Sequence, residues 1–282
     1  MQNIITNSKK DVIRIDATGL HYKVLNELIL EKINEFDAKK IEVLNVIGQR
    51  YIGSGIHKEV DIDIYGIPGN DLASFMNGPT IRVYGNVQDG VCNTMNYGKV
   101  VVNGDAGDVL CYGMRGGKLF VKGNVGYRVC IHMKEYKDFK PKVVVGGTAG
   151  DFFGEYMAGG ILVLLGLTSE KGQSIVGDYC ATGMHGGVIY IRGEIEEDFL
   201  GKEVRAFDID ENDRKVIGEL VTEFCDEFPE YSVHEIVKGR FIKLIPVSSR
   251  PYGRIYSYGG MHKVQLNYGE YTILECNYSA KK

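Results

Sequence analysis

The sequence has no apolar run long enough to cross a membrane. The longest run, residues 161–165, holds five apolar residues, whereas a membrane-spanning helix needs about 18 or more. Residues 1–11 are polar and lack the apolar centre of a secretion signal. The six cysteines include no short-spaced pair, which fits a reducing compartment. We therefore expect a cytoplasmic protein with no membrane contact.

An excess of basic charge is also missing. The formal net charge is -4, whereas a nucleic-acid-binding surface would normally show a basic patch, so we expect no nucleic-acid partner. Proline is scarce at 6 residues, but glycine reaches 37, roughly twice its average usage. Because glycine does not recur at every third position, collagen-like order is excluded. The glycines must therefore serve turns or close backbone approaches.

A tandem repeat accounts for these glycines. Seven of them end short β-like runs, at successive gaps of 19, 19, 19, 24, 19 and 27 residues. These marker glycines are Gly66, Gly85, Gly104, Gly123, Gly147, Gly166 and Gly193. A set of methionines keeps nearly the same register: Met76, Met95, Met114, Met133, Met157 and Met184. The extra residues in the longer gaps are polar and are interpreted as loops, at 134–142 and 168–173.

The residues two and four positions before each marker glycine are all aliphatic. A period of two places both side chains on one face of a strand. A 19-residue unit with one strand and no helical periodicity is too short for a propeller blade or a helical repeat. We therefore predict a mainly all-β chain, a right-handed single-stranded parallel β-helix of about seven coils. Equivalent positions would stack about 4.8 Å apart.

The two ends of the chain depart from the repeat. A strand at 12–16 and an amphipathic helix at 21–36 precede it, and a helix at 211–228 and a strand at 241–247 follow it. A solenoid needs such ends because an uncapped coil exposes strand edges and core. We expect three regions: an N-terminal cap at 1–40, the β-helix at 41–198, and an extension packed on the β-helix at 199–282.

A column of cysteines is the first candidate for chemistry. Cys92, Cys111 and Cys130 recur every 19 residues, so their sulfurs would stack along the coil. They form either a metal or redox site or an interior column of small side chains, since Ala73 and Gly154 share the column. Metal sites need ligands that converge on one point, which favours the interior column. With no phosphate-binding loop and no histidine pair at metal spacing, we predict no catalytic, cofactor-binding or metal-binding residue.

An outward-facing column three positions before the marker glycines is the second candidate. Five consecutive coils place an apolar or aromatic residue there: Val101, Phe120, Val144, Val163 and Tyr190. An exposed apolar stripe of this length should be covered by something. Either the terminal segments of the chain cover it, or it is an interface for a partner protein. These five residues are therefore candidate docking residues.

A family resemblance rests on the corner motif Met-x-Gly-Gly, as in residues 154–160 and 180–187. Together with the glycine-rich segment 45–55, it resembles the GXGXG domain over residues 16–193. That domain ends the large subunit of glutamate synthase and also occurs as a separate subunit of formylmethanofuran dehydrogenase. The resemblance implies a right-handed β-helix without catalytic residues, which holds a glutaminase and a flavin-binding synthase in relation to each other.

The resemblance therefore implies a non-catalytic docking subunit of a glutamate-synthase-like oxidoreductase in nitrogen metabolism. The expected partners are a glutaminase-type amidotransferase and an FMN-binding synthase subunit. FMN and an iron–sulfur cluster would be bound only by those partners. Assembly of this chain into a homo-oligomer is a further alternative. The tail at 241–253 is similar to that of separate subunits, and Arg50, Arg250 and Tyr252 are further candidate docking residues because arginine and tyrosine are typical anchors.

Two other functions stay open at this point. One is a scaffold like the corresponding subunit of formylmethanofuran dehydrogenase. The other is a free-standing β-helix enzyme or binding module that acts on a ligand in a groove along its side. Enzymes of this kind usually gather carboxylates or basic residues on one outer face. The outer columns here alternate in charge without a clear acidic pair. A ligand that stabilises the lone chain against heat would favour this alternative.

Overall fold

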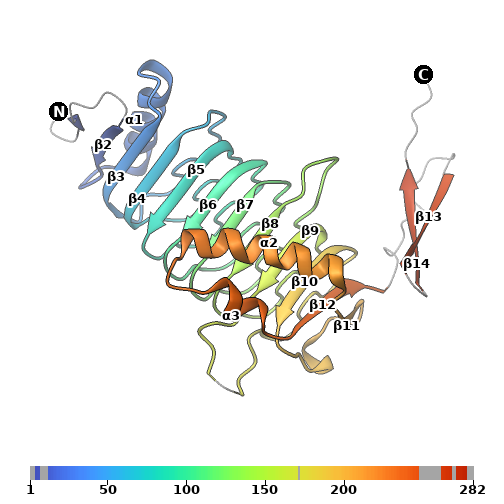
Figure 1. Ribbon diagram of the computed structural model, residues 1–282. Helices are drawn as coiled ribbons and strands as arrows, with labels where there is room; N and C mark the ends of the chain where they lie inside the picture. The colour runs from blue at the N-terminus through green and yellow to red at the C-terminus, as the bar shows by residue number, and fades with distance from the viewer. Residues whose placement is uncertain (1–3, 7–11, 171, 248–261, 269–270, 278–282) are drawn as a thin grey trace.

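The computed structural model describes residues 4–6, 12–170, 172–247, 262–268 and 271–277. The main body is an elongated solenoid, along which one broad sheet runs from end to end (Figure 1). The solenoid makes about six turns, close to the seven predicted, and its successive strands pair in parallel. The predicted β-helix is therefore confirmed. None of the helices in the described residues is long and apolar enough to cross a membrane.

Within the described residues the broad sheet has twelve strands, and from β1 to β10 their order in space is their order in the chain. The parallel strands are β2 (Val12–Asp16), β3 (Lys40–Ile47), β4 (Asp61–Ile67), β5 (Asn77–Tyr84), β6 (Tyr97–Val102), β7 (Lys118–Val121), β8 (Lys142–Val145), β9 (Ala158–Leu164) and β10 (Gly186–Arg192). Each parallel crossover is one turn of the coil, so every strand lies directly above its predecessor.

The repeat sets the register of this sheet. Ile62 pairs with Ile81, and Ile81 pairs with Val100, as the 19-residue spacing requires. All fourteen aliphatic residues two and four positions before the marker glycines are 0% exposed, and so are the six methionines of the repeat. The aliphatic columns therefore form one continuous interior, as predicted.

Each coil also contains a turn in which alternate residues have positive φ. In one coil these residues are Val109, Cys111 and Gly113, with φ of 57°, 58° and 56°. For a residue with a Cβ this conformation costs about 1–2 kcal/mol. Hydrogen bonds between coils offset the cost: the Val109 N–H donates to Tyr127 O at 3.0 Å and the Cys111 N–H to Val91 O at 2.7 Å. Stacking therefore holds a backbone that an isolated turn would avoid.

The glycine pairs lie at the other corner of the coil. The second glycine of each pair has positive φ, at Gly117, Gly160 and Gly187. A Cβ at Gly117 would lie 2.8 Å from the Gly98 carbonyl oxygen, so neither the conformation nor the space suits a side chain. The Met-x-Gly-Gly motif was predicted to form a corner of the coil, and this is confirmed for the second glycine of the motif.

The first strands and a helix cover the N-terminal end. Strand β1 (Ile4–Thr6) pairs antiparallel with β2. Helix α1 (Tyr22–Glu35) buries Leu25, Ile29 and Ile33, which share one helix face and join the solenoid interior. The cap therefore extends the same core.

The C-terminal segment caps the other end and then folds back along the sheet. After the short helix η1 (Glu197–Phe199) comes strand β11 (Val204–Asp208). Strand β12 (Phe241–Pro246) pairs antiparallel with β10, and β11 pairs antiparallel with β12 at the edge of the sheet. Between them lie α2 (Glu211–Glu227) and α3 (Val233–Val237). Strands β13 (His262–Tyr268) and β14 (Tyr271–Asn277) form a separate antiparallel hairpin.

Helix α2 crosses the outer face of the sheet, where it lies over the middle and later strands (Figure 1). The apolar stripe predicted as a candidate docking surface is buried beneath this segment. Its five residues are at most 3% exposed: Val101, Phe120, Val144, Val163 and Tyr190. They form a second core with α2, so the partner-docking prediction for them is wrong. The alternative, that the chain covers its own stripe, is correct.

Candidate functional site

Aromatic rings anchor α2 to the stripe. Phe224 lies edge-on to Phe120 with ring centroids 6.3 Å apart, and Phe228 packs against Phe224 at 4.7 Å. All three side chains are at most 1% exposed. The helix residues Ile217, Leu220 and Val221 complete the contact at helical spacing.

The N-terminal end of α2 is held by a polar cluster. Asp210 caps the helix, and its carboxylate accepts hydrogen bonds from the backbone N–H groups of Asn212 and Asp213. The Tyr190 hydroxyl donates to Asp213 Oδ1 at 2.7 Å, and Lys243 Nζ donates to Asp213 Oδ2 at 2.6 Å. Burial, followed by the hydrogen bond to Asp213, raises the pKa of Tyr190. Tyr190 is therefore a protonated donor that locks the helix to β10.

Ion pairs hold the other end of α2. Glu227 accepts hydrogen bonds from Arg82 Nε at 3.0 Å and from Lys99 Nζ at 2.5 Å. Burial acts to raise the pKa of Glu227, but the hydrogen bonds from Arg82 and Lys99 outweigh it and hold the pKa below its usual value. Glu223 pairs with Lys118 at 2.5 Å. The acidic face of α2 therefore neutralises a row of cations on the sheet.

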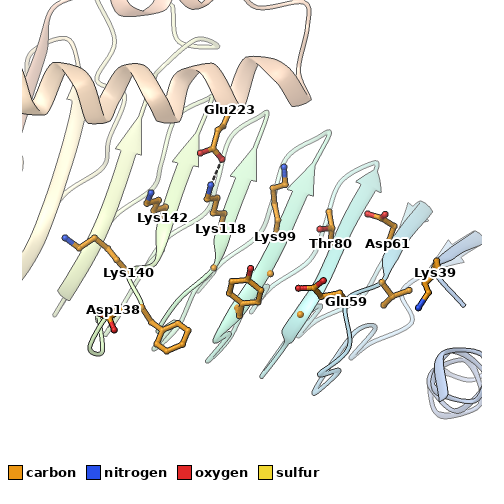
Figure 2. Close-up of a pocket in the computed structure, with 16 residues that line it drawn as sticks. Lys39, Glu59, Asp61, Thr80, Lys99, Lys118, Asp138, Lys140, Lys142 and Glu223 are labelled. Atoms are coloured by element: carbon orange, nitrogen blue, oxygen red, sulfur yellow. Dashed lines mark hydrogen bonds and ion pairs between the residues drawn. The ribbon is translucent and has the colours of Figure 1, made fainter. Parts of the chain in front are cut away.

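A shallow groove of about 920 Å³ opens on the sheet beside α2, and we call it the sheet groove. Figure 2 shows lysines of three adjacent strands along it, with Lys118 reaching Glu223. Lys99 pairs with Lys118, and Lys118 with Lys142, in the strand register. Asp61 and Asp138 also line this groove. The sheet groove therefore contains both a row of lysines and several carboxylates, so it carries charges of both signs.

A second groove, of about 720 Å³, lies on the positive-φ turns, and we call it the turn groove. Its floor is a stack of rings: His132 lies parallel to Tyr156 at 5.2 Å, and Tyr112 meets His132 edge-on at 5.8 Å. Tyr112 and Tyr156 are 43% and 45% exposed. Arg115 and Lys134 line the same groove beside these rings. Solvent-accessible rings beside cations are typical of binding surfaces.

A neighbouring ladder on the same turns extends this aromatic surface. Phe152 stacks on Tyr179 at 5.2 Å, and the Arg128 guanidinium lies 4.7 Å from the Phe152 ring centroid. Beneath them, Glu155 is 5% exposed and pairs with Arg128 at 3.2 Å. Phe152 therefore contacts both a ring and a cation on the outside of the solenoid.

The cysteine column lies in the interior. Cys92, Cys111 and Cys130 are free, buried and 0% exposed. Burial raises the pKa of the Cys92 and Cys111 thiols well above its usual value. Within the described residues no group of three or more His, Cys, Asp or Glu side chains could hold a metal ion. The interior position predicted for this column is therefore confirmed.

The remaining predicted docking residues have different positions. Arg50 is exposed, and its guanidinium lies 5.0 Å from the Tyr22 ring centroid and 5.9 Å from that of Tyr51. It joins the N-terminal cap to the first coil, and whether it binds a partner stays a prediction. Arg250 and Tyr252 lie outside the described residues.

The sequence carries a signal for the turn groove in the positions that follow the methionines of the repeat. Arg115, Lys134 and His185 each follow a methionine of the repeat directly. Reading the position after each methionine as an outward column would have aligned these basic residues. The sequence does not predict that His132 and Tyr156, which each directly precede a methionine of the repeat, stack beside these basic residues.

Comparisons with known proteins place the chain in a family. A family model described as "GXGXG motif" matches residues 31–247. The uncharacterized protein MJ1350 of Methanocaldococcus jannaschii is 50% identical over 250 residues, which cover 86% of this chain and 95% of that protein. A chain from the crystal structure of the formyltransferase/hydrolase complex (FhcABCD) of Methylorubrum extorquens, in complex with methylofuran, has a similar fold. It matches with a TM-score of 0.57 at 15% identity and covers 83% of this chain and 96% of that one.

Proposed function

Because this chain belongs to the GXGXG-motif family, we propose that it is a non-catalytic docking subunit of a glutamine-dependent, flavin-containing oxidoreductase similar to glutamate synthase. The observation that carries the proposal is the family match over 31–247, combined with a filled solenoid whose turns expose aromatic rings, such as Tyr112, Tyr156 and Tyr179. Exposed aromatic side chains are enriched where protein partners bind.

The interior of the solenoid supports a structural role. Its columns are aliphatic, methionine and cysteine side chains with 0% exposure, so the coil is a rigid rod rather than a container for a ligand. A rod of stacked coils offers long, flat faces on which two partner chains can bind at a set distance. In the proposed complex, the amidotransferase and the FMN-binding synthase subunits supply the cofactors and the chemistry.

The experiment is isolation of the tagged chain from its native cells under mild conditions, followed by assays of the eluate. We expect stoichiometric partner chains, flavin absorbance and hydrolysis of glutamine in the eluate, while the recombinant chain alone shows neither absorbance nor hydrolysis. Flavin bound by the recombinant chain alone would contradict the docking role. An eluate that transfers formyl groups, and has no glutaminase activity, would favour the runner-up, a scaffold in a formyltransferase/hydrolase type of complex.

A further inference from the structure

Two outer surfaces of the solenoid share one chemistry, but only one is covered. On the sheet, Lys99 and Lys118 stack on adjacent strands beside the buried ring of Phe120. Helix α2 covers them with acidic residues and a phenylalanine, namely Glu227, Glu223 and Phe224. On the sheet, an acidic amphipathic helix of the same chain therefore covers a strip of cationic and aromatic residues.

The turn groove repeats this strip without a cover. Arg115 and Lys134 lie on adjacent coils, because the Lys134 N–H donates to the Met114 carbonyl oxygen at 3.0 Å. Both are exposed, and among the described residues neither has an ion pair or a side-chain hydrogen bond. Adjacent coils are about 4.8 Å apart, so the two cations repel each other. A carboxylate from outside the chain would relieve that repulsion.

The remaining residues of the groove give it length and a floor. His185 continues the basic row two coils beyond Lys134, and the small side chain of Ala158 occupies the coil between them. Space is therefore left beside the Tyr156 ring, which stacks on His132. At the far end of the groove, Glu203 accepts a hydrogen bond from the Gly183 N–H at 2.9 Å. This carboxylate therefore already has a partner within the chain.

From this arrangement we propose that the turn groove binds an acidic amphipathic helix of a partner subunit, in the way that the sheet binds α2. The proposal rests on the docking function proposed above and names the surface and the chemistry of the partner. One helical turn rises about 5.4 Å, close to the spacing of the coils, so carboxylates four residues apart face Arg115 and Lys134. An apolar side chain of the same helix packs on Tyr156.

The direct test uses a helical peptide as the probe. Isolated helices shorter than about 12–15 residues are marginal in water, so the probe is a labelled alanine-rich peptide of about 20 residues with glutamate at every fourth position and one phenylalanine. Its twin carries lysine in place of glutamate. Fluorescence anisotropy measures binding of both peptides to the full-length wild-type chain and to the double variant Arg115→Glu/Lys134→Glu.

The matched control is Lys23→Glu/Lys215→Glu, which changes the net charge equally at two exposed lysines of α1 and α2. We expect the acidic peptide to bind the wild type and the control within about twofold of each other, and the groove variant to bind at least about tenfold more weakly. The lysine peptide should not bind. Equal losses in both double variants, or no binding of the acidic peptide to the wild type, would overturn the proposal.

The same variants separate this proposal from the docking function. When partners co-purify with the tagged wild type, the groove variant should recover about tenfold less of them and the control should recover them fully. Full recovery with the groove variant would refute the turn groove and leave the docking function standing. Absence of any partner from the wild type would refute the docking function, and the peptide titration then decides on the groove by itself.

Discussion

The Tyr190 hydroxyl donates a hydrogen bond of 2.7 Å to Asp213 Oδ1, between the last parallel strand of the solenoid and the first turn of α2. Tyr190 is 3% exposed and Asp213 is 9% exposed. The contact converts a position that the sequence presents as an outward-facing aromatic into an internal anchor. This buried pair therefore fixes the start of α2 to the solenoid, in addition to the aromatic contacts and ion pairs further along the helix.

Replacement of this anchor gives the first prediction. Tyr190→Phe should lower the free energy of unfolding by about 2 kcal/mol, because a buried carboxylate oxygen loses its donor. Urea denaturation monitored by circular dichroism measures the change. Tyr179→Phe, at a 58% exposed tyrosine, is the control and should be neutral. Equal effects of both changes would show that the hydroxyl of Tyr190 contributes nothing specific.

The aromatic contact of α2 gives the second prediction. Phe224→Ala should destabilise the chain by about 3–5 kcal/mol, since it leaves a cavity between Phe120 and Phe228. Limited proteolysis should then cut within α2 before the solenoid opens. Thr222→Ala, on the exposed side of the same helix, should stay within about 0.5 kcal/mol of the wild type. A wild-type protease pattern for Phe224→Ala would contradict the role of this ring.

The third prediction concerns acid. Because the pKa of folded Glu227 lies below its usual value, the unfolded chain binds this proton more readily than the folded chain does. The stabilisation is therefore fully present above the unfolded pKa, near 4.3, and is lost as the pH falls through the folded pKa. Glu227→Gln should destabilise the chain by about 2 kcal/mol at neutral pH and flatten the acid limb of a plot of stability against pH.

Thermal melts of wild type and Glu227→Gln across the acid range measure this effect. Glu219→Gln is the control, because Glu219 is exposed and has no ion pair among the described residues. It should leave the acid limb unchanged. If Glu227→Gln and the wild type lose stability in parallel as the pH falls, the pairing of Glu227 with Arg82 and Lys99 does not produce the acid sensitivity.

The fourth prediction concerns the cysteines. Burial raises the pKa of the Cys92 and Cys111 thiols well above its usual value, and that of Cys180 to about 12. The thiolate is the reactive form, so these three side chains should resist alkylation by iodoacetamide in the native protein and react fully after unfolding. Peptide mapping by mass spectrometry measures each site separately. Rapid native alkylation of Cys111 would show that the interior opens readily.

The fifth prediction contrasts two glycines. Gly117 has a φ of +80°, and a Cβ there would lie 2.5 Å from Met95 Cε, so Gly117→Ala should cost about 1–3 kcal/mol. Gly218 lies inside α2, and a Cβ there meets nothing within 4 Å. Gly218→Ala should therefore stabilise the chain by up to about 1 kcal/mol, because alanine favours the helix. Thermal unfolding separates the two, and shifts of the same sign would refute this account.

Much of the interior could be predicted from the sequence because the repeat acts at every level of the fold. The spacing of 19 residues aligned Ile62 with Ile81, and it predicted the buried columns, the corner glycines and the interior position of Cys111. Local pattern also sufficed for α2, which was predicted at 211–228 and is found at Glu211–Glu227. In each case neighbours along the chain, or one coil away, decide the outcome.

Contacts between distant segments could not be predicted in this way. The pattern of Phe120 and Val163 predicted an outward apolar stripe, and that of Phe224 an amphipathic helix, but nothing in either pattern paired the two. Their pairing is accompanied by ion pairs such as Arg82–Glu227, which join residues 145 positions apart. The turn groove depends in the same way on rings that the coil brings together.

The sequence by itself determined the repeat, the coil that the repeat builds and the residues that fill its interior, because a period in the chain becomes a stack in space. Only the tertiary structure decided which outer surfaces stay open. Helix α2 covers the stripe that contains Phe120 and Tyr190, while the rings of Tyr112 and Tyr156 remain exposed. Helix α2 lies about a hundred residues further along the chain than Phe120. It packs where the folded surface offers both a matching apolar area and the opposite charge, and these are properties of the folded surface.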